Sequence, residues 1–352
     1  MRAAEWLWRA ESVWARMARA LTTPLSWVYA GITAARGALY DAGVLAAQEP
    51  AIPVLSLGNL SVGGTGKTPL AAWAAARLRA AGAHPAIVMR GYGDDEPLVH
   101  AQLNPDVPVV ADADRVRGVA VARSRGADCA ILDDAFQHRR IRRRANWVLV
   151  ATEEWRDDLR LLPAGPLREP VSALRRADLL VVTRKSASRE AAESVAEQLG
   201  RWLRDREAVA LCHLQPSSLA DALGSACEPL SWLAGRDVVA VAAIGAPAAF
   251  FAQLAELGVR FAPMPFADHY AFDMRDVERI VRSANGRAGV ICTLKDAVKL
   301  VPLWPRNGPR LWYVSQRAVV ERGSAALDAS LGVILAARPD VTSTAGAPGS
   351  SA

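Results

Sequence analysis

A glycine-rich stretch between an apolar strand and a helix constrains this sequence most. Residues 52–57 are an apolar run that predicts a strand, and a helical pattern begins at Pro69 and ends near Ala81. The stretch between them reads Ser61-Val62-Gly63-Gly64-Thr65-Gly66-Lys67-Thr68. Glycines let several backbone N–H groups turn toward one phosphate, and the N-terminus of the following helix adds a favourable dipole. The context predicts a nucleotide-phosphate site, with a structural glycine turn as the alternative.

The last two residues of this loop carry the chemistry of such a site. We expect Lys67 to reach the β- and γ-phosphates and Thr68 to bind Mg²⁺. The strict pattern has glycine at position 61, where this chain has serine. The chain has 42 basic residues, of which only Lys67, Lys185, Lys295 and Lys299 are lysines. An arginine-rich sequence that keeps a compact ammonium at position 67 supports a phosphate contact there.

Strands that alternate with helices predict a parallel α/β sheet. After the strand at 52–57, further strands are expected at residues 85–89, 127–132, 147–151 and 179–183, with helices at 115–125 and 190–206. A second α/β run has strands at 238–244 and 289–293 and helices at 247–257 and 273–283. We expect N-terminal amphipathic helices over 1–46, a P-loop domain over 47–206, a linker over 207–236, a smaller α/β domain over 237–336 and a disordered tail over 337–352.

The first residues predict an amphipathic helix over 2–21. Its polar stripe consists of Arg2, Glu5, Arg9, Ser12, Arg16 and Arg19, and Trp6, Trp14, Met17 and Leu21 lie on the other face. Thr22-Thr23-Pro24 are expected to break it, and a second helix-like stretch continues to about Tyr40. The helix either packs on the domain or lies in a membrane interface, where Trp and Arg both sit well. No run of 18 apolar residues predicts a membrane-spanning helix.

Two consecutive acids, Asp133 and Asp134, follow the apolar strand that ends at Leu132. A carboxylate at this place holds the metal shell in P-loop folds, and the alternative is a helix cap. The four cysteines are scattered without metal-ligand spacing. The net charge of +6 suits an anionic partner such as a phosphorylated ligand, a membrane surface or nucleic acid.

With these residues in hand, the chain resembles the tetraacyldisaccharide 4′-kinase (lipid A 4′-kinase) family from about residue 15 to residue 335. The motifs that carry the resemblance are Gly58-Asn59 before the phosphate loop, Arg90-Gly91-Tyr92-Gly93, Asp95-Glu96-Pro97, Asp133-Asp134-Ala135-Phe136-Gln137-His138-Arg139-Arg140, Leu162-Pro163-Ala164-Gly165-Pro166-Leu167-Arg168-Glu169, Phe266-Ala267-Asp268-His269 and Thr293-Leu294-Lys295-Asp296-Ala297-Val298-Lys299. The resemblance implies a P-loop domain with a smaller α/β domain and the site in the cleft. It implies transfer of the ATP γ-phosphate to the 4′-hydroxyl of a lipid A disaccharide 1-phosphate, at the cytoplasmic face of a Gram-negative inner membrane.

The chain departs from the family pattern at four places. The family usually has Gly at position 135, His at 270 and Glu at 294, where this chain has Ala135, Tyr270 and Leu294. Ala135 is tolerated if its φ is negative. Leu294 removes a carboxylate, so we expect an ion pair at Lys295 to be lost. The segment between Tyr92 and Asp95 is shorter than in the family, as if a surface loop were deleted.

The resemblance also assigns roles to single residues. Asp95 and His269 are implied as an acid/base pair that takes the 4′-hydroxyl proton, with Lys67 as the third catalytic residue. Because Asp95 and His269 lie in different expected domains, catalysis would depend on domain closure. Thr68, Asp133, Asp134 and Glu169 are implied for Mg²⁺, and Ser61 to Thr68 for ATP. The arginines from Arg139 to Arg144 are interpreted as phosphate or acidic-lipid contacts, or as a solvated face.

Two other functions stay open at this point. One is a P-loop kinase or NTPase that acts on a soluble metabolite, which would have no use for a membrane-seeking helix. The other is a non-catalytic nucleotide-binding scaffold. Such a protein would have replaced Lys67, Thr68 or the Asp133-Asp134 pair by residues that do not support catalysis. We expect a monomer at the membrane surface without a nucleic-acid partner, because no aromatic interleaving accompanies the arginine run.

Overall fold

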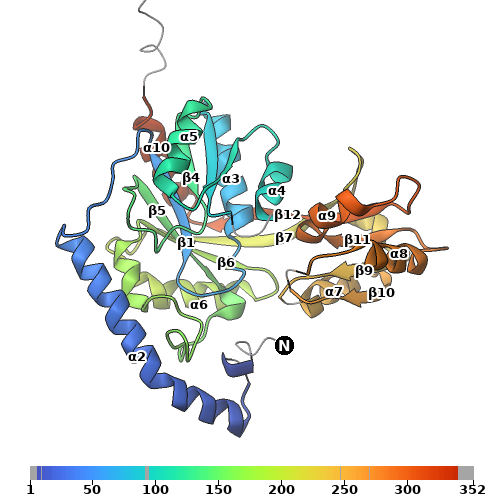
Figure 1. The fold of residues 1–352 in the computed structure, drawn as a ribbon, viewed down its shortest axis with the longest axis horizontal. Helices are drawn as coiled ribbons and strands as arrows, with labels where there is room; N and C mark the ends of the chain where they lie inside the picture. The colour runs from blue at the N-terminus through green and yellow to red at the C-terminus, as the bar shows by residue number, and fades with distance from the viewer. Residues whose placement is uncertain (1–5, 9, 92–94, 246, 269, 340–352) are drawn as a thin grey trace, which may run out of the picture. The chain divides into compact units, whose positions relative to one another are not determined.

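The chain divides into two compact units, which are described separately. Unit 1 comprises residues 1–90, 104–213 and 320–352, and unit 2 comprises residues 91–103 and 214–319 (Figure 1). The computed structural model describes residues 6–8, 10–91, 95–245, 247–268 and 270–339. Most of the tail expected to be disordered lies outside these residues.

Unit 1 is built on a parallel sheet in the strand order β7-β6-β5-β1-β4-β2-β3. The strands are β1 (Val54–Asn59), β2 (Pro85–Met89), β3 (Val109–Ala111), β4 (Cys129–Leu132), β5 (Ala145–Ala151), β6 (Leu179–Arg184) and β7 (Val209–Asp221). Every residue of β1, β2, β4 and β5 is buried. Strands covered on both faces read as apolar runs, which is why sequence located them. The predicted P-loop NTPase-like α/β fold is confirmed.

Helices cover both faces of this sheet. They are α2 (Val13–Asp41), α3 (Lys67–Ala80), α5 (Arg115–Ser124), α6 (Arg189–Gly200) and α10 (Ser324–Ala336), with short 3₁₀ turns at Thr152–Glu154 and Val171–Arg176. Helices α5 and α6 pack on the face that carries Val88 and Val182. The other face carries Trp147, whose ring lies 6.3 Å from that of Trp73 on α3 and whose indole donates to Ser330 on α10 at 2.7 Å.

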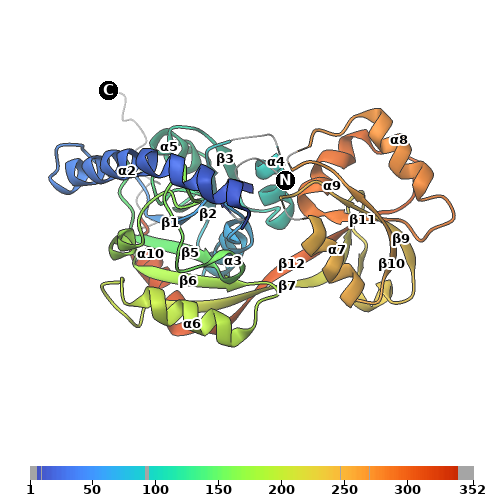
Figure 2. The same ribbon diagram turned by 90° about the horizontal axis from the view of Figure 1, so that it is seen from below.

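Helix α2 runs along the outside of unit 1 as one continuous helix (Figures 1 and 2). The expected break at Thr22-Thr23-Pro24 is therefore wrong, since Pro24 lies inside the helix. The hydroxyls of Thr22 and Thr23 donate to the carbonyls of Ala18 and Arg19 at 2.9 and 2.7 Å. These bonds lie one turn before the proline, whose missing N–H leaves the carbonyl of Ala20 without its usual helical donor.

Unit 2 has the strand order β10-β9-β11-β12-β7, with β8 on β7. Its elements are α4 (Asp95–Leu103), β8 (Cys227–Glu228), β9 (Asp237–Ala242), α7 (Pro247–Glu256), β10 (Arg260–Pro265), α8 (Met274–Ser283), β11 (Val290–Thr293), α9 (Leu294–Leu300) and β12 (Leu311–Arg322), with 3₁₀ turns at Leu230–Leu233 and Val301–Leu303. Helix α7 packs on one face with Phe250 and Leu254, and α8 and α9 pack on the other with Ile280 and Leu300.

The observed units differ from the expected domains in three segments. Residues 207–236, expected as a linker, contain the 13-residue strand β7. Residues 91–103 belong to unit 2 although the chain on both sides of them belongs to unit 1, and residues 320–336 belong to unit 1. Pro216, Ser217 and Ser218 interrupt the apolar pattern of β7, yet the backbone stays extended, because side-chain composition is only an indirect signal of strand pairing.

Candidate active site

The phosphate loop joins the central strand β1 to α3 as predicted. Gly63 and Gly66 have φ values of 143° and 84°, which are backbone conformations that favour glycine. The N–H of Val62 donates to the carbonyl of Pro166 at 2.8 Å, and the Thr183 hydroxyl donates to the carbonyl of Thr65 at 3.0 Å. Neighbouring segments therefore fix the loop independently of a ligand.

The two acids Asp133 and Asp134 lie at the same edge of the sheet as the phosphate loop. Strand β4, which precedes them, pairs directly with β1, with Ser56 opposite Leu132. Asp133 is buried, and its N–H donates to the carbonyl of Val88 at 3.0 Å. The Asp134 carboxylate lies 3.6 Å from the Lys67 ammonium, so the fold brings together two groups that the sequence separates by 67 positions.

The backbone explains how alanine replaces the glycine at position 135. Asp134 has a φ of 51°, the one positive value among the non-glycine residues that the structure describes. Aspartate tolerates this conformation better than most residues. Ala135 is fully buried and its φ is not positive. The condition under which Ala135 is tolerated is therefore confirmed.

The donor set at this edge fits Mg²⁺. Thr68 contributes a hydroxyl at the start of α3, and Asp133 and Asp134 contribute carboxylates from the adjacent strand end. Oxygen ligands of this kind suit a small hard cation that also binds phosphates. Within the described ranges, no cluster of three or more His, Cys, Asp or Glu side chains forms a cage for a metal on its own. A Mg²⁺ site whose coordination is completed by nucleotide phosphates agrees with these oxygen ligands and with the lack of a closed cage among the described residues.

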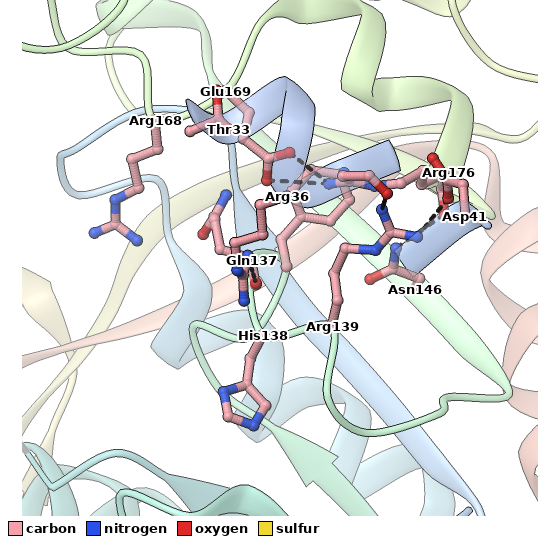
Figure 3. A network of polar contacts seen from close by, with 12 residues as sticks. Thr33, Arg36, Asp41, Gln137, His138, Arg139, Asn146, Arg168, Glu169 and Arg176 are labelled. Carbon is pink, nitrogen blue, oxygen red and sulfur yellow. Dashed lines mark hydrogen bonds and ion pairs between the residues drawn. The ribbon is translucent and has the colours of Figure 1, made fainter. Parts of the chain in front are cut away.

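Sequence reasoning selected Glu169 for this site and overlooked the arginine before it. The Arg168 guanidinium donates to both carboxylate oxygens of Asp134 at 3.0 Å. The Glu169 carboxylate instead pairs with Arg176 at 2.8 Å (Figure 3). The role of Glu169 at Mg²⁺ stays a prediction. Arg168 was recognisable as a candidate in the sequence because it lies inside the Leu162–Glu169 motif, directly before Glu169.

The arginine run after Asp134 is largely engaged within unit 1. Arg143 donates to the Ser56 hydroxyl at 3.1 Å and to the carbonyls of Ala135 and His138 at 3.0 and 2.7 Å. Burial lowers the pKa of Arg143 to about 10, so it stays charged at neutral pH. The remaining arginines form ion pairs: Arg139 with Asp41, Arg140 with Asp114, and Arg142 and Arg144 with Glu49. These contacts favour a structural interpretation of the run over a lipid or phosphate contact.

Helix α2 contacts the segments that carry the site. The Tyr29 hydroxyl donates to the carbonyl of Arg168 at 2.9 Å, and Arg36 donates to the carbonyl of Gln137 at 3.2 Å. Arg139 donates to Asp41 at the other end of the helix (Figure 3). Burial raises the pKa of the Tyr29 phenol, with a further increase from the Glu169 carboxylate, so the hydroxyl stays a donor at neutral pH.

Of the two predicted acid/base residues, the structure describes Asp95, which lies in unit 2. Asp95 begins α4, and one of its carboxylate oxygens lies 3.2 Å from the Lys299 ammonium on α9. His269 lies outside the described residues. The ring of Tyr270 is tilted against that of Phe266, with ring centroids 5.0 Å apart. The expected loss of an ion pair at Lys295 is wrong, because its ammonium lies 4.0 Å from Glu96 on α4.

Known proteins resemble this chain over most of its length. Residues 18–334 match the model of the tetraacyldisaccharide-1-P 4′-kinase family, LpxK. The chain is 38% identical over 336 residues to the tetraacyldisaccharide 4′-kinase of Anaeromyxobacter sp. (strain K), covering 87% of this chain and 88% of the relative. It is also 38% identical over 318 residues to that of Halorhodospira halophila, covering 84% and 88%.

A solved structure shares the fold. The crystal structure of "apo" form LpxK from Aquifex aeolicus in complex with ATP matches with a TM-score of 0.73 and 29% identity, covering 90% of this chain and 99% of that one. The family model spans well over half of this chain, and both named relatives exceed 30% identity over most of it. The chain therefore belongs to the tetraacyldisaccharide-1-phosphate 4′-kinase family.

Proposed function

We propose that the chain transfers the γ-phosphate of ATP to the 4′-hydroxyl of a tetraacyldisaccharide 1-phosphate. The observation that carries the proposal is the pairing of Lys67 and Asp134 across the ends of β1 and β4, beside the glycine turn of the phosphate loop. A P-loop lysine and a strand-end carboxylate are the parts that phosphoryl transfer requires. Family membership supplies the acceptor.

We assign one set of residues to ATP and another to the disaccharide acceptor. In unit 1, the backbone of Ser61–Thr68 and the Lys67 ammonium bind and orient the β- and γ-phosphates. Thr68, Asp133 and Asp134 would hold Mg²⁺, which when bound neutralises charge on the transferring group. In unit 2, Asp95 orients the 4′-hydroxyl and accepts its proton, with His269 as its predicted partner. Loose phosphoryl-transfer transition states need positioning more than a strong base.

The outward face of α2 supports a membrane-surface location. Of the described side chains of α2, those of Ala15 and Ser26 are buried, and Ser26 donates to the Leu161 carbonyl at 3.0 Å while Tyr29 donates to that of Arg168. The apolar side chains point outward, with exposed fractions of 73% for Trp14, 78% for Leu21 and 70% for Trp27. This polarity is the reverse of a helix packed on a core, and it suits the interface of a bilayer.

A basic cavity lies between the N-terminal part of α2 and residues 156–166. It has a volume of about 350 Å³ and is lined by four arginines and two acids, which are Arg16, Arg19, Arg156, Arg160, Glu11 and Asp158. The excess of guanidinium groups suits an anionic lipid surface. Within the described part of the chain, no helix is both long and apolar enough to span a bilayer. We assign the chain a peripheral position at the cytoplasmic face of the inner membrane.

The activity is tested with purified protein, Mg²⁺, γ-labelled ATP and two acceptors, the disaccharide 1-phosphate and a soluble monosaccharide. We expect label on the 4′-position of the lipid acceptor and none with Lys67→Ala. Label on the soluble sugar alone would favour the soluble-metabolite alternative. ATP turnover without any labelled acceptor would contradict the kinase assignment.

Membrane docking is tested by flotation with vesicles of phosphatidylethanolamine and phosphatidylglycerol. The triple variant Trp14→Glu, Leu21→Glu, Trp27→Glu should bind at least about tenfold more weakly, because each buried apolar side chain contributes about 1.5–3 kcal/mol. The matched control is Val333→Glu on α10, whose side chain is 49% exposed in the same unit. Equal flotation of both proteins would refute docking through α2.

A further inference from the structure

The motif from Thr293 to Lys299 has no role in the mechanism above, although it begins α9 in a tightly fixed manner. The Thr293 hydroxyl caps the helix by accepting from the N–H of Asp296 at 3.3 Å and donates to the Asp296 carboxylate at 2.7 Å. The same carboxylate accepts from the N–H of Ala243, which follows β9, at 3.2 Å. Asp296 is fully buried. The first turn of α9 is therefore fixed to the sheet of unit 2.

Two lysines of this motif meet two acids at the start of α4. Lys295 and Lys299 are four residues apart, so they lie on one face of α9. Lys299 lies 3.2 Å from Asp95, and Lys295 lies 4.0 Å from Glu96. The two pairs differ in burial: the side chains are 16% and 7% exposed for Lys299 and Asp95, and 40% and 38% exposed for Lys295 and Glu96.

We infer that Lys299 is the positioning residue for Asp95, which it holds in the orientation that receives the acceptor hydroxyl. The inference rests on the proposed role of Asp95. The support for the inference itself is geometric. Helix α9, which is fixed to the sheet of unit 2, places the largely buried ammonium of Lys299 next to the buried carboxylate of Asp95 in the same unit. The exposed pair of Lys295 and Glu96 makes the second, weaker link between the same two helices.

The physical case follows from what a buried carboxylate needs. Burial of a carboxylate that is 7% exposed costs free energy unless a charged or hydrogen-bonding partner compensates it, and Lys299 supplies a cation there. The ion pair places the Lys299 ammonium 3.2 Å from one oxygen of Asp95, on the side of α4 that faces α9. In a loose phosphoryl transfer, the position of the acceptor group matters more than the strength of the base. Gln102 at the other end of α4 bonds to Tyr313 at 3.4 Å, so both ends of the helix are held.

The test compares Lys299→Met with Lys299→Arg in the transfer assay with the full chain. We expect Lys299→Met to lower kcat by about 10- to 100-fold, the cost of a misplaced reacting group, with KM for ATP unchanged. Lys299→Arg keeps the charge and should recover part of the loss. Lys295→Met should lose less than Lys299→Met, and Arg260→Met, which removes an exposed cation from β10, is the matched control.

A double variant separates this inference from the proposed function. If Lys299 acts through Asp95, then Asp95→Asn with Lys299→Met should be as slow as Asp95→Asn alone. Full activity of Lys299→Met beside an inactive Asp95→Asn would overturn the inference and leave the proposed function intact. An active Asp95→Asn would overturn the inference and the proposed role of Asp95, whereas the transfer activity itself would stand. Lys299→Gln replaces Lys299→Met if thermal unfolding shows that the latter does not fold.

Discussion

The Tyr29 hydroxyl on α2 donates to the backbone carbonyl of Arg168 at 2.9 Å, and the Arg168 guanidinium bonds both carboxylate oxygens of Asp134. Asp134 in turn lies 3.6 Å from Lys67. Two residues thus connect the outward-facing apolar helix with the phosphate loop. The helix that we assign to the membrane surface also supports the segment that positions the nucleotide site.

Tyr29→Phe should therefore slow catalysis without detaching the protein from vesicles. The variant removes one hydrogen bond worth about 1 kcal/mol, which corresponds to a decrease of about fivefold in kcat if Arg168 shifts. Steady-state assays and flotation measure the two effects. Thr33→Val is the matched control, since the Thr33 hydroxyl donates only to α2 carbonyls one turn earlier. Equal loss in both variants would show that the helix alone was perturbed.

Gly63→Ala should destabilise the protein in the absence of nucleotide. Gly63 has a φ of 143°, and a Cβ placed there would lie close to the Glu154 carboxylate. Strain at such a position costs about 1–3 kcal/mol, which urea unfolding measures. At Gly64, an added Cβ meets nothing within 4 Å, so Gly64→Ala should change the free energy of unfolding by less than about 0.5 kcal/mol. Similar values for the two variants would contradict the role of Gly63.

Arg143→Met should cost far more stability than Arg142→Met. Arg143 bonds to three backbone carbonyls, the Asn146 amide oxygen and the Ser56 hydroxyl, and its loss leaves acceptors unsatisfied at a cost of about 2–4 kcal/mol. Arg142 is exposed and makes one ion pair at 3.6 Å with Glu49, worth about 0–1 kcal/mol. Denaturant unfolding of the two variants side by side measures the difference, and equal midpoints would refute it.

His138 should contribute to the loss of stability in mild acid. Burial, aided by Arg115 and Arg143, lowers the pKa of His138 from 6.5 to about 4 in the folded chain. The unfolded chain therefore binds more protons between these values, and the free energy of unfolding falls as pH decreases from about 6.5 to 4. His138→Gln should reduce that decrease by about 1–3 kcal/mol. Unfolding measured at pH 7 and pH 4.5 tests it; an unchanged slope in the variant would contradict the shift.

The sequence by itself predicted the residues of the candidate nucleotide site and the strands beside them. The phosphate loop is a local pattern, because its glycines, lysine and threonine lie within eight residues of a strand and a helix. Asp133 and Asp134 were found for the same reason, since they follow a fully buried strand. The buried parallel strands were also readable, because continuous apolar runs reflect burial on both faces.

Only the tertiary structure decided which charges meet. Arg168 and Asp134 are 34 positions apart in the sequence, and Lys299 and Asp95 are 204 positions apart. Local patterns such as the helical repeat of apolar residues do not predict contacts over such distances. The continuity of α2 through Pro24 and the strand β7 in the expected linker likewise depend on partners elsewhere in the chain. Local sequence propensity predicts the helices and strands. Pairing between distant segments decides which charged groups lie next to one another, and therefore which of them can act together.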